Sequence, residues 1–117
     1  MSFEMNFWKN KRVCVTGGSG FLGSVIVRKL QELECADIVV PRSKDFDLRR
    51  EESIKRLYKD VRPEVVIHLA AIVGGIGANR AKPAEFFYDN LMMGTQLLHH
   101  AWICGIDKFI GIGTVCA

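Results

Sequence analysis

One stretch of the sequence decides the fold: Arg12-Val13-Cys14-Val15-Thr16-Gly17-Gly18-Ser19-Gly20-Phe21-Leu22-Gly23. Its β-branched and apolar run, residues 13–16, is typical of a strand that is buried on both faces. The glycines at positions 17, 20 and 23 then open into a helical pattern. A glycine turn between a strand and a helix lets a pyrophosphate approach the first N–H groups of the helix. Three spaced glycines alone also fit a bare turn, but the flanking strand and helix favour dinucleotide binding.

Length and composition limit the classes of protein to consider. The chain has 117 residues, which is one domain at most, and its mean hydropathy is +0.12. Acidic and basic residues are interspersed and the net charge is +3, so we expect no nucleic-acid partner. The four cysteines lack Cys-x-x-Cys spacing, which indicates reduced thiols in a cytoplasmic protein. Residues 1–11 show no signal peptide and no apolar run is long enough for a bilayer, so we expect no membrane partner.

The remaining pattern alternates strands with helices. After an N-terminal lead-in at 1–11, we expect strands at 12–16, 37–40, 64–71 and 108–113, and helices at 20–34, 51–60 and 83–104. This order predicts an α/β fold, the N-terminal half of a Rossmann-type doubly wound parallel sheet over 12–117. Right-handed crossovers give the strand order 3-2-1-4-5, in which residues 45–48 supply a short third strand.

Two predicted helices each carry an apolar face that we expect to point inward. In the first helix this face consists of Phe21, Leu22, Val25, Ile26, Leu30 and Leu33. In the long helix it consists of Phe87, Leu91, Gly94, Leu98, Ala101 and Trp102. The adjacent histidines His99 and His100 are expected at the surface or partly packed.

Three features near the ends of predicted strands have alternative interpretations. Arg42 and Lys44 follow the second strand, where a base accommodates the 2′-phosphate of NADP and an acid binds the 2′-hydroxyl of NAD. The same residues also fit a solvated basic turn. His68 lies within a buried strand, which favours a core residue over a catalytic base. The glycine-rich loop 72–79 follows a strand's carboxyl end, so it is either a ligand loop or a flexible crossover.

Several motifs together resemble the extended short-chain dehydrogenase/reductases, the NAD-dependent epimerase/dehydratase family. They are the glycine loop, Asp47-Leu48, His68-Leu69-Ala70-Ala71 and Asn90-x-x-x-Gly94-Thr95. The resemblance covers nearly the whole chain after residue 11. A narrower resemblance, carried by 73–79, 83–86 and 113–116, is to the branch that performs NADPH-dependent 3,5-epimerisation and 4-reduction of GDP-4-keto-6-deoxymannose.

The resemblance implies roles for individual residues. It implies cofactor binding by Gly17, Ser19, Gly20, Phe21, Leu22, Gly23, Arg42, Asp47, Leu48, Leu69, Ala70 and Ala71. Thr114 matches the family's hydrogen-bond donor to the 4-keto group of the sugar, and Cys116 matches the acid/base of epimerisation. The implied cofactor is NADP, the implied substrate is a nucleotide sugar, and the implied assembly is a homodimer. No metal ligand set is implied.

The sequence departs from the family at the catalytic pair. No Tyr-x-x-x-Lys occurs in it, so we expect the cofactor-binding part of such an enzyme, truncated before that pair and inactive alone. Other interpretations remain open. One is the corresponding half of another nucleotide-sugar epimerase/dehydratase; the loop 73–76 and Cys116 argue against a UDP-sugar 4-epimerase. The others are a non-catalytic dinucleotide-binding module and an interaction fragment.

Overall fold

The computed structural model describes residues 7–69 and 83–111. The elements in chain order are β1 (Arg12–Thr16), α2 (Phe21–Glu32), β2 (Asp37–Val39), α3 (Glu51–Val61), β3 (Val65–His68), α5 (Pro83–Ile103) and β4 (Lys108–Gly111). Each of these strands and helices lies within a segment predicted for its type, apart from the last residue of α3. The main difference is that β3 ends at His68, whereas the predicted strand continued to residue 71.

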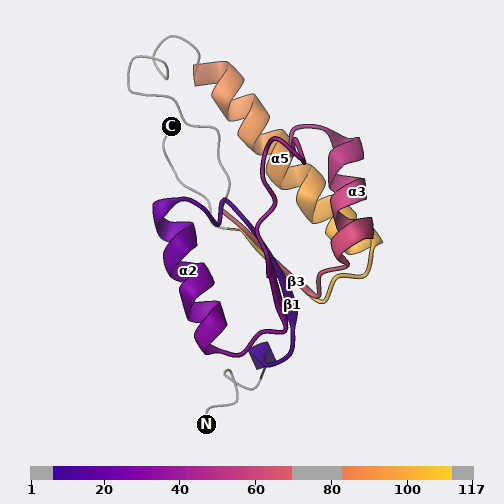
Figure 1. Ribbon diagram of the computed structural model, residues 1–117. Coiled ribbons are helices and arrows are strands. Elements are labelled where there is room, and N and C mark those ends of the chain that lie inside the picture. The colour runs from indigo at the N-terminus through magenta and orange to yellow at the C-terminus, as the bar shows by residue number, and fades with distance from the viewer. Residues whose placement is uncertain (1–6, 70–82, 112–117) are drawn as a thin grey trace.

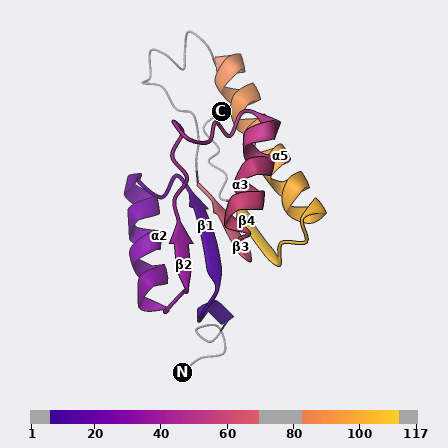
Figure 2. The same ribbon diagram turned by 45° about the vertical axis from the view of Figure 1, so that its right-hand side comes forward.

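The strands form one parallel sheet in the order β2-β1-β3-β4. Figures 1 and 2 show α2 on one face of this sheet and α3 with α5 on the other. This is the Rossmann-type α/β arrangement that the sequence predicts, with the first strand inside the sheet. Because all strands run the same way, their carboxyl ends share one edge, where ligands bind in open α/β sheets.

The predicted third strand is wrong. Residues 45–48 form turns, in which the N–H groups of Asp45 and Phe46 both donate to the carbonyl oxygen of Arg42 at 2.9 Å. Only two residues of this segment, Phe46 and Leu48, contact the core. The alternation of apolar and polar residues is therefore too short to specify a strand. In the described part of the chain, β2 is therefore an edge strand.

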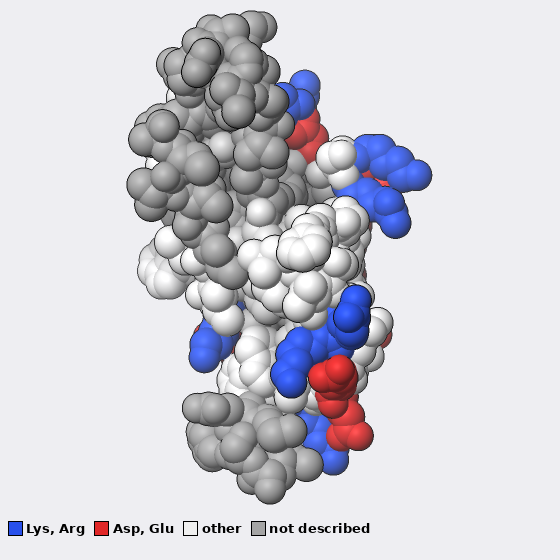
Figure 3. Space-filling model, turned by 90° about the vertical axis from the view of Figure 1, so that its left-hand side faces the viewer, with Lys and Arg blue, Asp and Glu red and all other residues white. Residues whose placement is uncertain are grey.

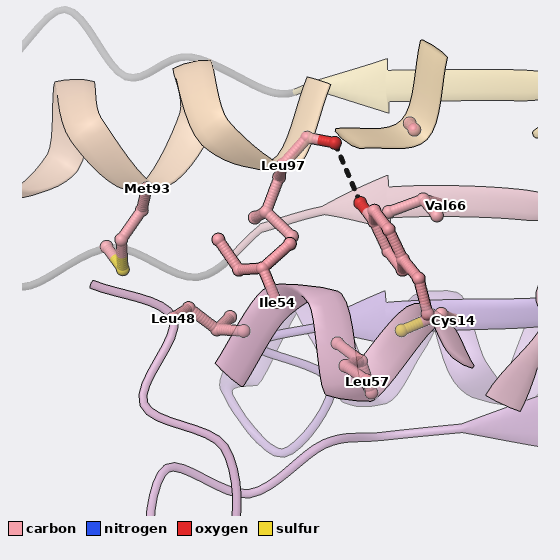
Figure 4. Close-up of a cluster of buried hydrophobic side chains, with 9 residues drawn as sticks. Cys14, Leu48, Ile54, Leu57, Val66, Met93 and Leu97 are labelled. Atoms are coloured by element: carbon pink, nitrogen blue, oxygen red, sulfur yellow. Dashed lines mark hydrogen bonds between the residues drawn. The ribbon is translucent and has the colours of Figure 1, made fainter. Parts of the chain in front are cut away.

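The core consists of two clusters, one on each face of the sheet. One lies between the sheet and α2 and contains Val13, Val15, Leu30, Val65 and Ile67. The other lies under α3 and α5, and Figure 4 shows how its side chains interlock. Within it, the buried hydroxyl of Tyr58 on α3 donates to the carbonyl oxygen of Leu97 on α5 at 2.9 Å. Burial raises the pKa of Tyr58, so this hydroxyl remains a neutral donor.

The inward face of α5 differs from the predicted one. Met93, Leu97, His100 and Ala101 are buried, whereas Leu91, Leu98 and Trp102 are more than half exposed. Of the predicted face, Ala101 is buried, Gly94 lies near His68, and the side chain of Phe87 is outside the described residues. Apolar residues occupy both sides of α5, so periodicity alone could not select the inward one.

Polar contacts between α3 and α5 select that side. Besides the Tyr58 hydrogen bond, the Nε2 atom of buried His100 lies 2.9 Å from Oε1 of Glu51. His100 is therefore a packed residue that joins two helices, while its neighbour His99 is exposed. Despite its length and apolar character, α5 does not qualify as a membrane-spanning helix, nor does any other helix in the described residues.

The predicted apolar face of α2 is also only partly correct. Leu30 is buried and Ile26 packs against the sheet, but Phe21, Leu22 and Val25 are exposed. Figure 3 views the molecule from the side of α2 and shows an uncharged area between groups of charged side chains. The helix is rotated because Gly23 must face the preceding glycine turn, which turns the face of residues 23, 26, 27 and 30 toward the sheet.

The outer face of α5 exposes large apolar side chains, from which we predict that copies of the chain associate with one another. Four large exposed side chains lie on one stripe of the helix, because positions 88, 91, 95, 98 and 102 are spaced by three and four residues; they are Tyr88, Leu91, Leu98 and Trp102. Residues 90–106 contain no Asp, Glu, Lys or Arg. We expect concentration-dependent association of the chain, measured by size-exclusion chromatography with light scattering. The double variant Leu91→Gln/Leu98→Gln should remain monomeric, because both changes are at exposed positions on this face.

Val25→Gln is the control, since it removes an exposed apolar side chain from α2 instead. Association that survives the α5 double variant, or that is lost equally in the α2 control, contradicts the prediction.

Candidate functional site

The glycine turn between β1 and α2 lies at the carboxyl edge of the sheet. Gly17 has φ +75°, a conformation that favours glycine, and its carbonyl oxygen accepts the N–H of Gly20 at 3.1 Å. Gly20 is the N-cap of α2 and provides no side-chain cap; the first turn contains no acidic residue. The helix therefore begins with its N–H groups and positive dipole end uncompensated by side chains, which suits an anion.

Two glycines, Gly18 and Gly23, lie where the turn packs too closely against other atoms for a side chain to fit. A Cβ atom on Gly23 would lie 2.0 Å from the carbonyl oxygen of Gly17 and 2.6 Å from Cα of Gly18. A Cβ atom on Gly18 would lie 2.7 Å from Cγ2 of Val40, which follows β2. The missing side chain at Gly23 thus lets α2 pack closely against the turn itself. The role of Gly18 was missed, because its contact is with a residue distant in sequence.

A pocket of about 620 Å³ opens beside this turn. Five of its lining residues are predicted site residues: Gly17, Ser19, Arg42, Asp47 and Leu48. The other lining residues are Pro41, Ser43, Lys44, Phe46, Arg49 and Met93. The pocket thus joins the glycine turn to the segment that follows β2, with Leu48 also reaching the hydrophobic core.

The remaining predicted residues lie elsewhere. Gly20, Phe21, Leu22, Gly23 and Leu69 do not line this pocket, and the side chain of Phe21 is 91% exposed. Ala70, Ala71, Thr114, Cys116 and the loop 72–79 lie outside the described residues. The structure therefore brings five of the predicted cofactor-binding residues together at one pocket.

The charges around the pocket are predominantly positive. Arg42, Lys44 and Arg49 line it together with one carboxylate, that of Asp47. Arg49 donates to both oxygens of this carboxylate, from Nε at 3.0 Å and from a terminal nitrogen at 3.0 Å. The hydrogen bond from Arg49 holds the pKa of Asp47 below its usual value, so the carboxylate stays charged. Sequence reasoning singled out Arg42 and Lys44 but missed Arg49.

Beneath the pocket, a buried contact ties β1 to β3 at their carboxyl ends. The hydroxyl oxygen of Thr16 lies 2.7 Å from Nδ1 of His68, and both residues are buried. The N–H of Leu69 donates to the hydroxyl oxygen and to the carbonyl oxygen of Thr16, each at 3.0 Å. His68 is thus a hydrogen-bonded core residue, as the sequence favours, and it fixes the strand ends from which the glycine turn and residues 69–71 continue.

The described residues offer other polar groups, but none forms a competing catalytic centre. They contain no group of His, Cys, Asp and Glu side chains that could hold a metal ion. A hollow of about 820 Å³ lies at the opposite, amino edge of the sheet, near Arg12, Glu64 and Asp107. It is larger, yet none of the predicted site residues lines it. The smaller pocket at the carboxyl edge is therefore the candidate site.

Gly23→Ala should destabilise the protein by roughly 3 kcal/mol or more, because the added methyl group meets backbone atoms that cannot rotate away. Gly94→Ala is the matched control. Its Cβ atom would lie 3.8 Å from His68 Nε2, an ordinary contact, and alanine favours the helix by up to about 1 kcal/mol. Urea unfolding of both variants measures the difference, and equal stability of the two variants would show that the turn accommodates a side chain.

The stability of the fold should fall at acidic pH through His68. Burial lowers the pKa of His68, so the folded state resists protonation more than the unfolded chain does. This contribution is present above the unfolded pKa of about 6.5 and is lost as pH falls from there toward the lower folded pKa. The variant His68→Asn should show a smaller loss of unfolding free energy between pH 8 and pH 5; His99→Asn, at an exposed position, should behave as wild type. An identical pH dependence in wild type and His68→Asn would contradict this assignment.

Comparison with known protein families and curated relatives agrees with this geometry. A model of the NAD dependent epimerase/dehydratase family matches residues 13–117. The GDP-L-fucose synthase of Sinorhizobium fredii (strain NBRC 101917 / NGR234) is 39% identical over 106 residues, which cover 91% of this chain and 33% of that protein. GDP-L-fucose synthase 1 of Arabidopsis thaliana is 37% identical over 108 residues, covering 92% and 33%. The chain thus spans about a third of the length of these relatives.

Solved structures show the same similarity. A GDP-mannoheptose C4 reductase from Campylobacter jejuni with NADP bound superposes with a TM-score of 0.81 at 27% identity, covering 89% of this chain and 33% of that one. A GDP-L-fucose synthetase from Naegleria fowleri bound to NADP gives 0.76 at 31% identity, covering 92% and 32%. The fold, the glycine turn and these matches agree, and the chain belongs to the NAD dependent epimerase/dehydratase family.

Proposed function

We propose that this chain is the cofactor-binding part of a nucleotide-sugar epimerase/reductase resembling GDP-L-fucose synthase, and that it binds NADP. The observation that carries the proposal is the pocket that Arg42 and Lys44 line together with Gly17 and Ser19 of the glycine turn. A dinucleotide with a 2′-phosphate needs an anion site at a helix N-terminus and a second, cationic site near the end of the second strand. Gly17 and Ser19 of the turn that leads into α2 line the pocket, and Arg42 and Lys44 supply the cationic site.

The residues present fit the adenosine half of this cofactor. The volume of about 620 Å³ lies within the range of small-molecule sites. Gly17, Gly18 and Gly20 carry no side chains, so a pyrophosphate can approach the backbone of the turn. Phe46 and Leu48 provide apolar surface for the adenine ring. Arg42 and Lys44 are exposed cations near the expected 2′-phosphate.

The proposed reaction is the 3,5-epimerisation and 4-reduction of GDP-4-keto-6-deoxymannose. NADPH, when bound, supplies the hydride for the reduction of the 4-keto group. In the proposal, Thr114 donates a hydrogen bond to the keto oxygen, and Cys116 exchanges protons with the sugar carbons during epimerisation. Three cysteines in the described residues, Cys14, Cys35 and Cys104, are free thiols, which suits a proposed cytoplasmic location.

The proposal includes a homodimer, with a second copy covering the outer face of α5. Tyr88, Leu91, Leu98 and Trp102 together expose on the order of 500 Å². Two such faces in contact bury about 1,000 Å², near the lower limit for a specific interface. A face that pairs with itself needs no charge complementarity, and residues 90–106 of this helix and its following turn carry no charge. The association measurement on the α5 variants tests this part of the proposal.

Arg42→Gln should weaken the binding of NADPH by about tenfold and leave that of NADH within about twofold, because the guanidinium meets only the 2′-phosphate. Titration calorimetry of both cofactors against the chain measures the change. Lys59→Gln is the control, since it removes an exposed cation from α3 that does not line this pocket. Equal affinity for the two cofactors, unchanged by Arg42→Gln, would overturn the assignment of NADP.

A further inference from the structure

The side chain of Arg49 is held in place by Asp47. Three donors of Arg49 reach the carboxylate of Asp47: Nε and a terminal nitrogen at 3.0 Å each, and the backbone N–H at 3.1 Å. A guanidinium held by both oxygens of a carboxylate has one fixed plane, unlike an arginine on an unconstrained stem. Both residues line the pocket beside the glycine turn.

The local backbone explains why this pair forms. Asp47 opens the turn that precedes α3, and its carbonyl oxygen accepts the N–H of Arg50 at 2.9 Å. An aspartate in such a turn bonds the backbone two residues on, which brings the side chain of that residue back toward its carboxylate. The orientation of Arg49 therefore follows from the turn and does not require a bound ligand.

The pair changes the charge that the pocket presents. Arg42, Lys44 and Arg49 contribute three positive charges to the lining, and Asp47 contributes one negative charge. The excess of two matches a phosphate monoester, which carries close to two negative charges at neutral pH. Without Arg49 the excess would be one. Arg49 also keeps part of its hydrogen-bonding capacity, because a guanidinium has five N–H donors and Asp47 occupies two of them.

We propose that Arg49 is a specificity-determining residue that binds the 2′-phosphate of the adenosine, and that Asp47 is the positioning residue that orients it. This inference rests on the proposed function, since it assigns a further residue to the same pocket. It also gives Asp47 a more specific task than the cofactor binding that the family resemblance implies. With three donors of Arg49 already on its carboxylate, Asp47 has little remaining capacity for a base.

The competing explanation is that the pair only stabilises the turn before α3. The two explanations differ in selectivity. A purely structural pair would affect the binding of every adenosine ligand alike, whereas a phosphate contact affects only ligands that carry the 2′-phosphate. The informative quantity is therefore the ratio of the affinities for adenosine 2′,5′-bisphosphate and adenosine 5′-monophosphate, two probes that differ in that phosphate alone.

The experiment is titration calorimetry of both probes against the 117-residue chain and its variants. For wild type we expect the bisphosphate to bind at least about tenfold more tightly. Arg49→Gln should reduce this ratio by about fivefold or more. Asp47→Glu keeps the negative charge but moves the carboxylate by one methylene group, so it should loosen the guanidinium and reduce the ratio in the same direction. Arg28→Gln is the matched control, because Arg28 is an exposed arginine on α2 that does not line the pocket.

The outcomes separate this inference from the proposed function. If wild type binds neither probe, or binds both equally, the assignment of an NADP site fails and Arg49 loses its role with it. If wild type prefers the bisphosphate and Arg49→Gln keeps that ratio, only the inference about Arg49 is overturned. A thermal melt of each variant accompanies the titrations, and a variant that is unfolded is replaced by Arg49→Lys, which keeps the charge but cannot hold both carboxylate oxygens.

Discussion

The contact of Gly23 with the backbone of Gly17 and Gly18 is the constraint on which the site depends. The first turn of α2 lies so close to the glycine turn that there is no room between them for a Cβ atom on Gly23. That approach sets the rotation of α2, and through it which side chains pack on the sheet. It also sets where the N–H groups at the start of the helix point. The candidate anion site and the packing of α2 therefore have one cause.

A second constraint acts on the other side of β1. Thr16 and His68 are the last residues of two adjacent strands, and their buried hydrogen bond joins the strand ends just below the pocket. The N–H of Leu69 donates to the same hydroxyl oxygen. The glycine turn is thus anchored at both ends, by this contact before it and by Gly23 after it. A rigid turn requires less ordering when an anion binds.

The sequence predicted the strands, the helices and the parallel sheet because these follow from local patterns. Glycine spacing and a β-branched run were sufficient to place the turn between β1 and α2. The inward faces were harder: α5 is apolar on two sides, and the choice between them is made by Tyr58 and Glu51, which lie on another helix. The predicted strand at 45–48 is wrong because the backbone N–H groups of Asp45 and Phe46 donate to Arg42 in a turn and do not pair with a strand. Arg49 was missed because its importance lies in a side-chain contact and not in a motif.

The arrangement of the pocket separates binding from chemistry along the chain. Apart from Met93, the lining residues lie in two short segments, 17–19 and 41–49, to which the proposed function assigns the adenosine half of the cofactor. The residues proposed for the sugar, Thr114 and Cys116, follow the last strand of the described sheet. The pocket segments follow β1 and β2, whereas Thr114 and Cys116 come after β4 in the sequence. In the sheet, β3 separates β4 from β1. Under the proposed function, selectivity for the cofactor can therefore change through residues 41–49 without a change at Thr114 or Cys116, and the charges of Arg42, Lys44 and Arg49 are where such a change would occur.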